Sequence, residues 1–68
     1  MIKVLICNDL GDEMRTKIPV IPDVGDIVQW VTDNTPEEGF MLSKVISRTH
    51  VFNDNGKFMY IEIYVEDI

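Results

Sequence analysis

The side chains that could support covalent chemistry are one cysteine, Cys7, and one histidine, His50. A thiol activated by an imidazole, with an acid or amide to orient it, is the minimal set for nucleophilic catalysis by cysteine. Cys7 closes the apolar run Ile2–Cys7, and a cysteine in such a run normally packs as a small core residue. One thiol and one imidazole also leave a closed zinc site short of ligands. We therefore predict no catalytic dyad and no zinc site.

The carboxylates gather in turns rather than in a recognisable metal motif. They stand at Asp9, Asp12 and Glu13, at Asp23 and Asp26, and at Asp54. A calcium loop of the EF-hand type needs oxygen ligands at alternate positions, a central glycine and a closing Glu, whereas Val51 occupies the first ligand position of the nearest match. Glycine-rich phosphate loops and the G-x-S-x-G elbow of esterases are absent. We therefore expect a protein that is not an enzyme and holds no cofactor.

The size and charge of the chain limit its function further. Its 68 residues are 46% hydrophobic and 26% charged, which is typical of one small globular domain. Twelve acidic residues against six basic ones give a net charge of −6, which disfavours nucleic acids and anionic membranes as partners. A single cysteine permits no intrachain disulfide, and the apolar start is shorter than a signal peptide. We expect a cytoplasmic protein that does not enter a membrane.

Short apolar runs separated by turn residues predict an all-β domain. The expected strands cover residues 2–7, 13–20, 27–31, 40–52 and 57–65. In the second strand Met14, Thr16 and Ile18 alternate with charged residues, which predicts one buried and one exposed face. The fourth strand is longer than the usual strand of about 5–6 residues. We therefore expect a β-bulge or kink in it, between Ser43 and Ser47.

Two turns and one ambiguous segment connect these strands. Residues 8–12 are expected to join the first two strands as a hairpin. In the turn at residues 21–26, Gly25 is expected at positive φ and Asp26 is expected to accept hydrogen bonds from backbone N–H groups. Residues 32–39 form either a loop or a single helical turn over Thr35-Pro36-Glu37-Glu38.

The last two strands form the best-defined hairpin, around residues 53–57. A two-residue loop and a three-residue loop closed by Gly56 differ by one residue in register, which turns a strand over. The three-residue loop pairs Phe52 with Phe58, His50 with Tyr60, Arg48 with Glu62 and Ile46 with Tyr64, and directs Met59, Ile61, Ile63 and Val65 inward. The two-residue loop sets His50 against Ile61 and Arg48 against Ile63. We predict the three-residue loop, because it sets opposite charges and aromatic partners across from each other.

This register leaves a large apolar set on the outward face of the hairpin. Its members are Ile46, His50, Phe52, Phe58, Tyr60 and Tyr64. Either another part of the chain, such as residues 32–39 or the first strand, covers this face, or the face binds a partner. We take it as the candidate partner-binding surface, and we expect Tyr60→Ala or Phe58→Ser to abolish association without unfolding the monomer.

The turn that leads into the third strand resembles the entry turn of SH3-like small barrels. The residues that carry the resemblance are Pro22, Gly25, Asp26 and Val28, followed by a long bent fourth strand. Over residues 19–65 the chain is similar to small proteins of bacteriophages and gut bacteria with such a Gly-Asp turn. The resemblance implies a five-stranded barrel and no activity, and an OB-like partial barrel is the alternative. The chain lacks the tyrosine-rich motif of peptide-binding SH3 domains and the glycine-rich second half of KOW-type barrels.

The leading functional hypothesis is a protein-interaction or self-association module. An acidic inhibitor that imitates nucleic acid is the first alternative, and its residues would be Asp9, Asp12, Glu13, Asp23, Asp26, Glu37 and Glu38. A nucleic-acid-binding barrel is the second alternative. That function would need the basic residues Arg15, Lys17, Lys44 and Arg48 to gather on one side.

Overall fold

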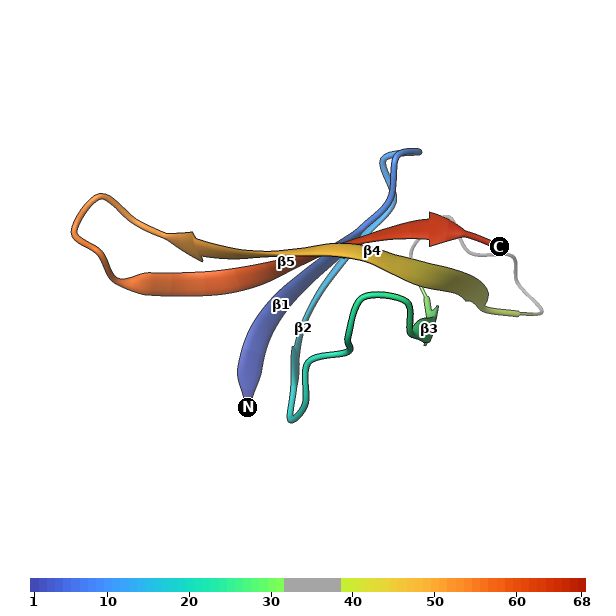
Figure 1. Cartoon of the computed structure of the whole chain (residues 1–68), viewed down its shortest axis with the longest axis horizontal. Helices are drawn as coiled ribbons and strands as arrows, with labels where there is room; N and C mark the ends of the chain where they lie inside the picture. Colours follow the sequence, from blue (N-terminus) through green and yellow to red (C-terminus); the bar gives the residue numbers. More distant parts are fainter. Residues whose placement is uncertain (32–38) are drawn as a thin grey trace.

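The computed structural model describes residues 1–31 and 39–68, which form five β-strands in one sheet (Figure 1). The strands are β1 (Ile2–Cys7), β2 (Glu13–Ile18), β3 (Ile27–Trp30), β4 (Met41–Phe52) and β5 (Phe58–Asp67). The all-β prediction is confirmed, and every strand lies close to its expected bounds. The helical turn considered at residues 35–38 lies outside the described residues. Over the described ranges, no helix is long and apolar enough to cross a membrane.

The strand order β2-β1-β5-β4-β3 places β1 and β5, from opposite ends of the chain, side by side at the centre of the sheet. β1 pairs in parallel with β5 from Val4 to Cys7, and the other three pairings are antiparallel. A strand with a parallel neighbour is usually covered on both faces and reads as a continuous apolar run. This explains why three consecutive residues of β1, Val4, Leu5 and Ile6, are all buried.

The sheet curls around a single hydrophobic core. The core consists of Val4, Ile6, Trp30, Val45, Ile61, Ile63 and Val65. We call the face of the sheet that carries this core the inner face and the opposite face the outer face. Within the described residues no backbone ladder joins β2 to β3, so the curled sheet is a half-barrel (Figure 1). This architecture is compatible with the small barrel that we expected.

The turns form as their residues predict. Asn8 closes the β1–β2 hairpin, because its Oδ1 accepts hydrogen bonds from the backbone N–H groups of Leu10 (3.1 Å) and Asp12 (2.9 Å). In the turn before β3, Gly25 has a φ of 97° and Asp26 Oδ2 accepts a hydrogen bond of 2.9 Å from the backbone N–H of Asp23. These turns fix the ends of β1, β2 and β3 through local hydrogen bonds.

The turn of the β4–β5 hairpin has the predicted three-residue geometry. The backbone N–H of Asn53 donates to the carbonyl of Lys57 at 2.9 Å, and Gly56 has a φ of 79°. Phe52 pairs with Phe58, as expected. The predicted register therefore holds at the turn itself.

Beyond the turn the predicted register is wrong. Val51 pairs with Tyr60, His50 with Ile61, Thr49 with Glu62, Arg48 with Ile63 and Ser47 with Tyr64. The pairing skips Met59, so β5 carries one extra residue at a bulge, and the strand pair changes to the register that we had rejected. A second bulge skips Ile46 and returns the strands to the predicted register, in which Val45 pairs with Val65. This second bulge lies inside the predicted interval from Ser43 to Ser47.

The two bulges leave the core side chains of β5 on the inner face and turn over the segment of β4 that lies between them. Ile61, Ile63 and Val65 of β5 are buried, as predicted, whereas Met59, which was also expected inside, is exposed. The charge and aromatic pairs on which we based the register are worth only about 0.2–1 kcal/mol each. The predicted register also directs Ile61, Ile63 and Val65 inward, so burial of these residues does not distinguish the two registers. What the bulges change is the face of the β4 residues between them, which turns Arg48 and His50 to the inner side.

A largely buried polar network ties β3, β4 and β5 to the turn between β1 and β2. Trp30 Nε1 donates a hydrogen bond to Ser43 Oγ (2.9 Å), and Ser43 Oγ donates to Asp67 Oδ1 (2.7 Å). Asn8 Nδ2 donates to Asp12 Oδ2 (3.1 Å) and to the carboxylate of Asp67 (3.3 Å to Oδ2). The network extends β5 to Asp67, beyond the predicted end of the strand.

Candidate functional site

The β4–β5 hairpin extends beyond the rest of the sheet as an arm, which we define as residues 49–60 (left side of Figure 1). β1 pairs only with residues 61–64 of β5, and β3 pairs only with residues 41–44 of β4. The described part of the chain is 42 Å long and 23 Å wide, with a radius of gyration of 12.3 Å. A compact chain of this length would have a radius of gyration of roughly 11 Å. The arm accounts for this elongation.

The strands of the arm have open edges. No described strand pairs with the β1-facing edge of Phe58–Tyr60 or with the β3-facing edge of Thr49–Phe52. Such edges present backbone N–H and C=O groups that can pair with another extended chain. Natural domains commonly protect them with charged side chains, but the only formal charges in the arm are Asp54 and Lys57, both near its turn. The arm is therefore electrically neutral in a chain of net charge −6.

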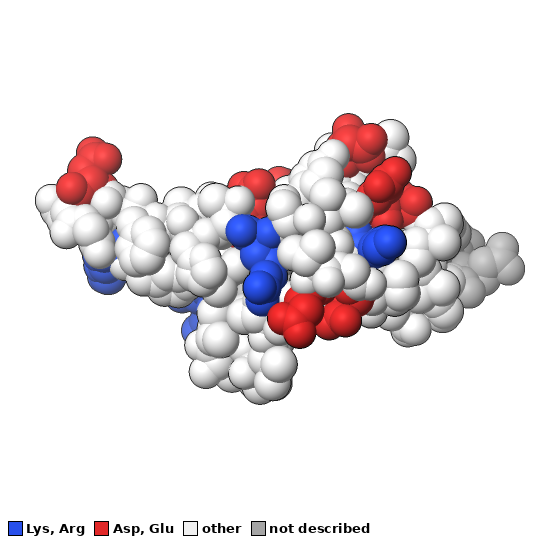
Figure 2. All heavy atoms as spheres, viewed as in Figure 1, with Lys and Arg blue, Asp and Glu red and all other residues white. Residues whose placement is uncertain are grey.

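The end of the arm carries exposed apolar side chains. Phe52, Phe58 and Met59 are 57%, 39% and 43% exposed. The two phenyl rings meet edge to face, with their centroids 5.8 Å apart. In the face shown in Figure 2, the surface of the arm is mostly uncharged apart from its tip, and acidic groups gather on the other half of the molecule. The arm therefore combines open strand edges with exposed aromatic rings.

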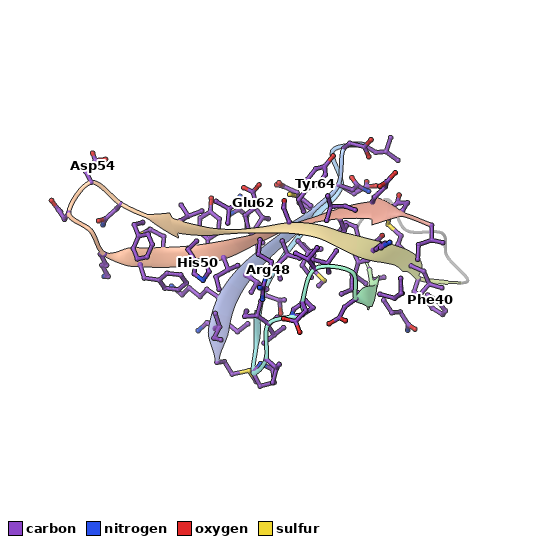
Figure 3. The ribbon with its side chains drawn as sticks, in the orientation of Figure 1. Phe40, Arg48, His50, Asp54, Glu62 and Tyr64 are labelled. Carbon is purple, nitrogen blue, oxygen red and sulfur yellow. The ribbon has the colours of Figure 1, made fainter. Side chains whose placement is uncertain are left out.

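The six predicted partner-binding residues do not share one face. Tyr60 and Tyr64 pair with Val51 and Ser47 and lie on the outer face, whereas His50 pairs with the core residue Ile61 and lies on the inner side. Figure 3 shows Tyr64 and Glu62 on one side of the hairpin and His50 and Arg48 on the other. The pair Phe52–Phe58 lies on the same side as His50. Ile46 has no partner on β5, because it is the residue skipped at the second bulge. The predicted single face is wrong because the bulge at Met59 reverses the parity.

The rest of the chain covers only some of these six residues. Tyr60 and Tyr64 are half-buried, while Ile46, His50, Phe52 and Phe58 are exposed. Met59 belongs to the same exposed set, and sequence reasoning missed it because alternation assigned it to the core. A bulge leaves no signal in the alternation of residue types, so nothing in the sequence marked Met59 as exposed.

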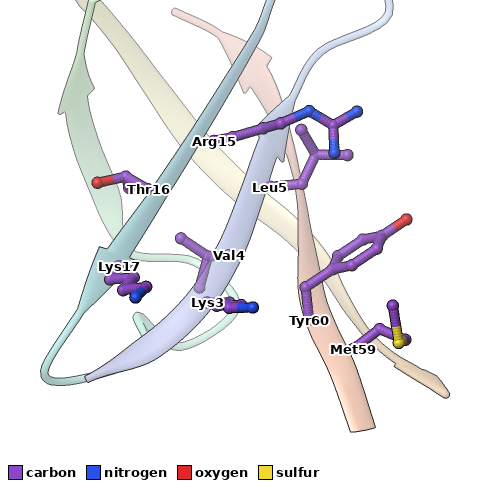
Figure 4. A pocket seen from close by; sticks show the side chains of 8 residues that line it. All are labelled: Lys3, Val4, Leu5, Arg15, Thr16, Lys17, Met59 and Tyr60. Atoms are coloured by element: carbon purple, nitrogen blue, oxygen red, sulfur yellow. The ribbon is translucent and has the colours of Figure 1, made fainter.

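A groove opens where β1 and β5 diverge (Figure 4). It has a volume of about 440 Å³ and is lined by Lys3, Val4, Leu5, Arg15, Thr16, Lys17, Met59 and Tyr60. Sequence reasoning placed Arg15 and Lys17 on one exposed strand face, but only the parallel pairing of β1 with β5 brings Met59 and Tyr60 opposite them. Lys44 does not line this groove, and Arg48 forms an ion pair of 3.4 Å with Asp23 at another site.

The acidic residues named for nucleic-acid imitation belong mainly to turns. Asp12 is buried against Asn8, Asp26 accepts a backbone hydrogen bond, and Asp23 lies beside Arg48. Glu37 and Glu38 lie outside the described residues. Within the described residues no group of three His, Cys, Asp or Glu side chains is placed to hold a metal ion.

Cys7 is half-buried on the outer face, between Glu13 of β2 and Tyr64 of β5. His50 lies on the inner side, so the two side chains that could form a dyad are on opposite faces. Burial raises the pKa of the Cys7 thiol, and the nearby carboxylates of Glu62 and Glu13 raise it further. Burial and then the charge of Asp9 likewise raise the pKa of Tyr64.

We expect Cys7 to react slowly with iodoacetamide at neutral pH, because the thiolate is the reactive form and the raised pKa keeps the thiol protonated. The pH profile of alkylation should lie at higher pH in the folded chain than in the chain unfolded in urea. Glu62→Gln removes one of the two charges that raise the pKa and should shift the folded profile to lower pH. Identical profiles in the folded and unfolded chains would contradict the proposed environment of the thiol. Because the folded chain holds the thiol proton more tightly than the unfolded chain, protonation of Cys7 adds to the free energy of unfolding. This contribution is fully present below the pKa of the unfolded thiol and is lost as the pH rises through the pKa of the folded thiol.

Comparisons of the chain with protein-family models, with curated proteins and with solved structures found no match. The resemblance to SH3-like barrels therefore stays a prediction.

Proposed function

We propose that this protein is a non-enzymatic protein-interaction module that associates with a second copy of itself through the β4–β5 arm. The observation that carries the proposal is the arm itself, whose open strand edges and exposed Phe52, Phe58 and Met59 lie outside the core. An edge strand with exposed apolar side chains is a template for pairing with another strand. Two copies related by a twofold axis would bury the same surface on both partners.

The charge of the arm also favours a second copy as the partner. Two chains of net charge −6 repel each other at long range, so an acidic surface would oppose self-association. The arm carries one negative and one positive formal charge, at Asp54 and Lys57. Contact between two arms therefore brings together the least acidic part of each chain.

Light scattering behind a sizing column, over a concentration series, tests this proposal. The wild-type chain should show a mass that rises from monomer towards dimer with concentration. Phe52→Asp should keep the chain monomeric, because it would place a carboxylate in the apolar contact at the end of the arm. Phe58→Ser and Tyr60→Ala should weaken association in the same way.

Phe40→Asp is the matched control for this experiment. Phe40 is 49% exposed, close to the 57% of Phe52, and lies at the opposite end of β4 (Figure 3). The substitution changes the net charge equally but should leave the dimer intact. A wild-type monomer at every concentration, or equal loss of the dimer in both variants, would refute association through the arm.

A further inference from the structure

Half of the basic residues of this acidic chain line one groove. Lys3, Arg15 and Lys17 are three of its six basic residues, and all three line the groove between β1–β2 and β5. Lys3 and Lys17 are direct cross-strand partners, an arrangement of like charges that destabilises a sheet. The structure gives neither lysine an ion pair within the described residues. Arg15 has only a 3.9 Å contact with Glu13, and both side chains are exposed, so the pair neutralises little.

The floor and far wall of the groove are apolar. Leu5 is only 7% exposed although it lies on the outer face and outside the core cluster. Met59 and Tyr60 form the wall on the β5 side, and Figure 4 shows the Arg15 side chain extending over Leu5. Cations along one side and apolar groups along the other fit a ligand that carries both acidic and apolar side chains.

The backbone of β5 offers a place for an extended ligand. The pairing of β1 with β5 starts at Val4 and Ile61, so the edge of Phe58–Tyr60 faces the groove with no described strand beside it. An extended peptide can add to such an edge through main-chain hydrogen bonds. Arg15 and Lys17 lie two residues apart on β2, which in a strand is about 7 Å. Acidic residues at positions i and i+2 of an extended peptide have the same spacing and point to the same side.

We propose that this groove binds an extended acidic segment of a partner protein, with a Glu-x-Glu pattern whose carboxylates contact Arg15 and the Lys3–Lys17 pair. A short acidic peptide fits better than a nucleic acid, because the acidic residues Glu13 and Glu62 lie beside the cations on the same outer face. A long polyanion would have to pass these carboxylates, whereas a short peptide ends within the groove. The site shares the open edge of Phe58–Tyr60 with the arm, so a dimer that pairs through this edge would compete with the peptide.

The test is fluorescence anisotropy with a labelled peptide of alternating glutamate and valine, titrated with the full-length protein. The glutamate peptide should bind, and the matched peptide with glutamine in place of glutamate should bind about tenfold or more weakly, since charge-assisted contacts are lost. Binding should also weaken with added salt. Equal affinity for the two peptides would overturn the proposal.

Lys17→Glu separates binding from folding. The change replaces a Lys–Lys cross-strand pair with a Lys–Glu pair, so the melting temperature should stay the same or rise while peptide affinity falls at least about tenfold. Lys44→Glu is the matched control, because it changes the net charge equally but lies outside the groove. Equal loss of affinity in both variants, or tighter Lys17-dependent binding of a single-stranded oligonucleotide, would overturn the proposal. Phe52→Asp, which should be monomeric, should bind the peptide at least as well as the wild type, so failure of self-association leaves this test valid.

Discussion

Ile63→Ala is expected to lower the free energy of unfolding by about 2–5 kcal/mol, the usual cost of truncating a buried isoleucine. Ile63 is 0% exposed and lies in the central strand, where it pairs with Ile6 of β1 on one side and with Arg48 of β4 on the other. A domain of this size has a net stability of roughly 3–5 kcal/mol. The variant should therefore be largely unfolded at 25 °C, as followed by urea denaturation with circular dichroism.

Two further variants make this prediction decisive. Ile63→Val removes a single methylene and should cost about 0.5–1.5 kcal/mol, which leaves a folded protein for measurement. Ile46→Ala changes the residue skipped at the second bulge, whose side chain is exposed, and should cost far less than Ile63→Ala. If Ile46→Ala destabilised the chain as much as Ile63→Ala, the assignment of these two residues to surface and core would be wrong.

Ser43→Ala is expected to lower the free energy of unfolding by about 1–3 kcal/mol, although it removes only one oxygen atom. Ser43 is fully buried, and its hydroxyl accepts a hydrogen bond from Trp30 Nε1 and donates one to Asp67. Without the hydroxyl the buried indole N–H loses its acceptor, and such a group costs free energy when it is withdrawn from water without a partner. Thermal unfolding followed by tryptophan fluorescence measures the loss, since Trp30 is the only tryptophan.

Ser47→Ala is the matched control for Ser43→Ala. Ser47 is on the same strand but exposed, so its substitution should change the stability by less than about 0.5 kcal/mol. Equal effects of the two substitutions would show that the hydrogen bonds around Ser43 add nothing to stability. A loss of stability in Ser43→Ala alone would support the conclusion that these hydrogen bonds stabilise the contact of β4 with β3 and β5.

Local structure could be predicted from the sequence because its causes are local. The alternation of Met14, Thr16 and Ile18 with charged residues defined β2, and the burial of the strand follows that alternation. Gly25 and Gly56 stand at positive φ because side-chain-bearing residues avoid that region. Both positions were identified from the turn residues around them.

Non-local pairing could not be predicted in the same way. The apolar run of residues 2–7 predicted a strand, but nothing in it identified β5 as its parallel neighbour. The bulge at Met59 lies beside the point where the pairing of β1 with β5 begins, at Val4 and Ile61, and that pairing joins opposite ends of the chain. A single extra residue then moved His50 to the opposite side from Tyr60.

The candidate surface was found in the right hairpin but with the wrong arrangement. Counting apolar residues pointed to Phe52 and Phe58, which are exposed at the end of the arm. The projection of the arm depends on where β1 stops pairing with β5, and that information is not local. The basic groove was missed for the same reason, since Lys3 and Tyr60 are distant in sequence.

The central claim is that two copies associate through the arm, and nuclear magnetic resonance tests it most directly. Amide spectra of ¹⁵N-labelled protein, recorded at a low and a high concentration, report which residues enter a contact. Concentration-dependent shifts should concentrate in residues 49–60, and Phe52→Asp should abolish them. Shifts confined to other strands, or identical spectra at both concentrations, would contradict the account.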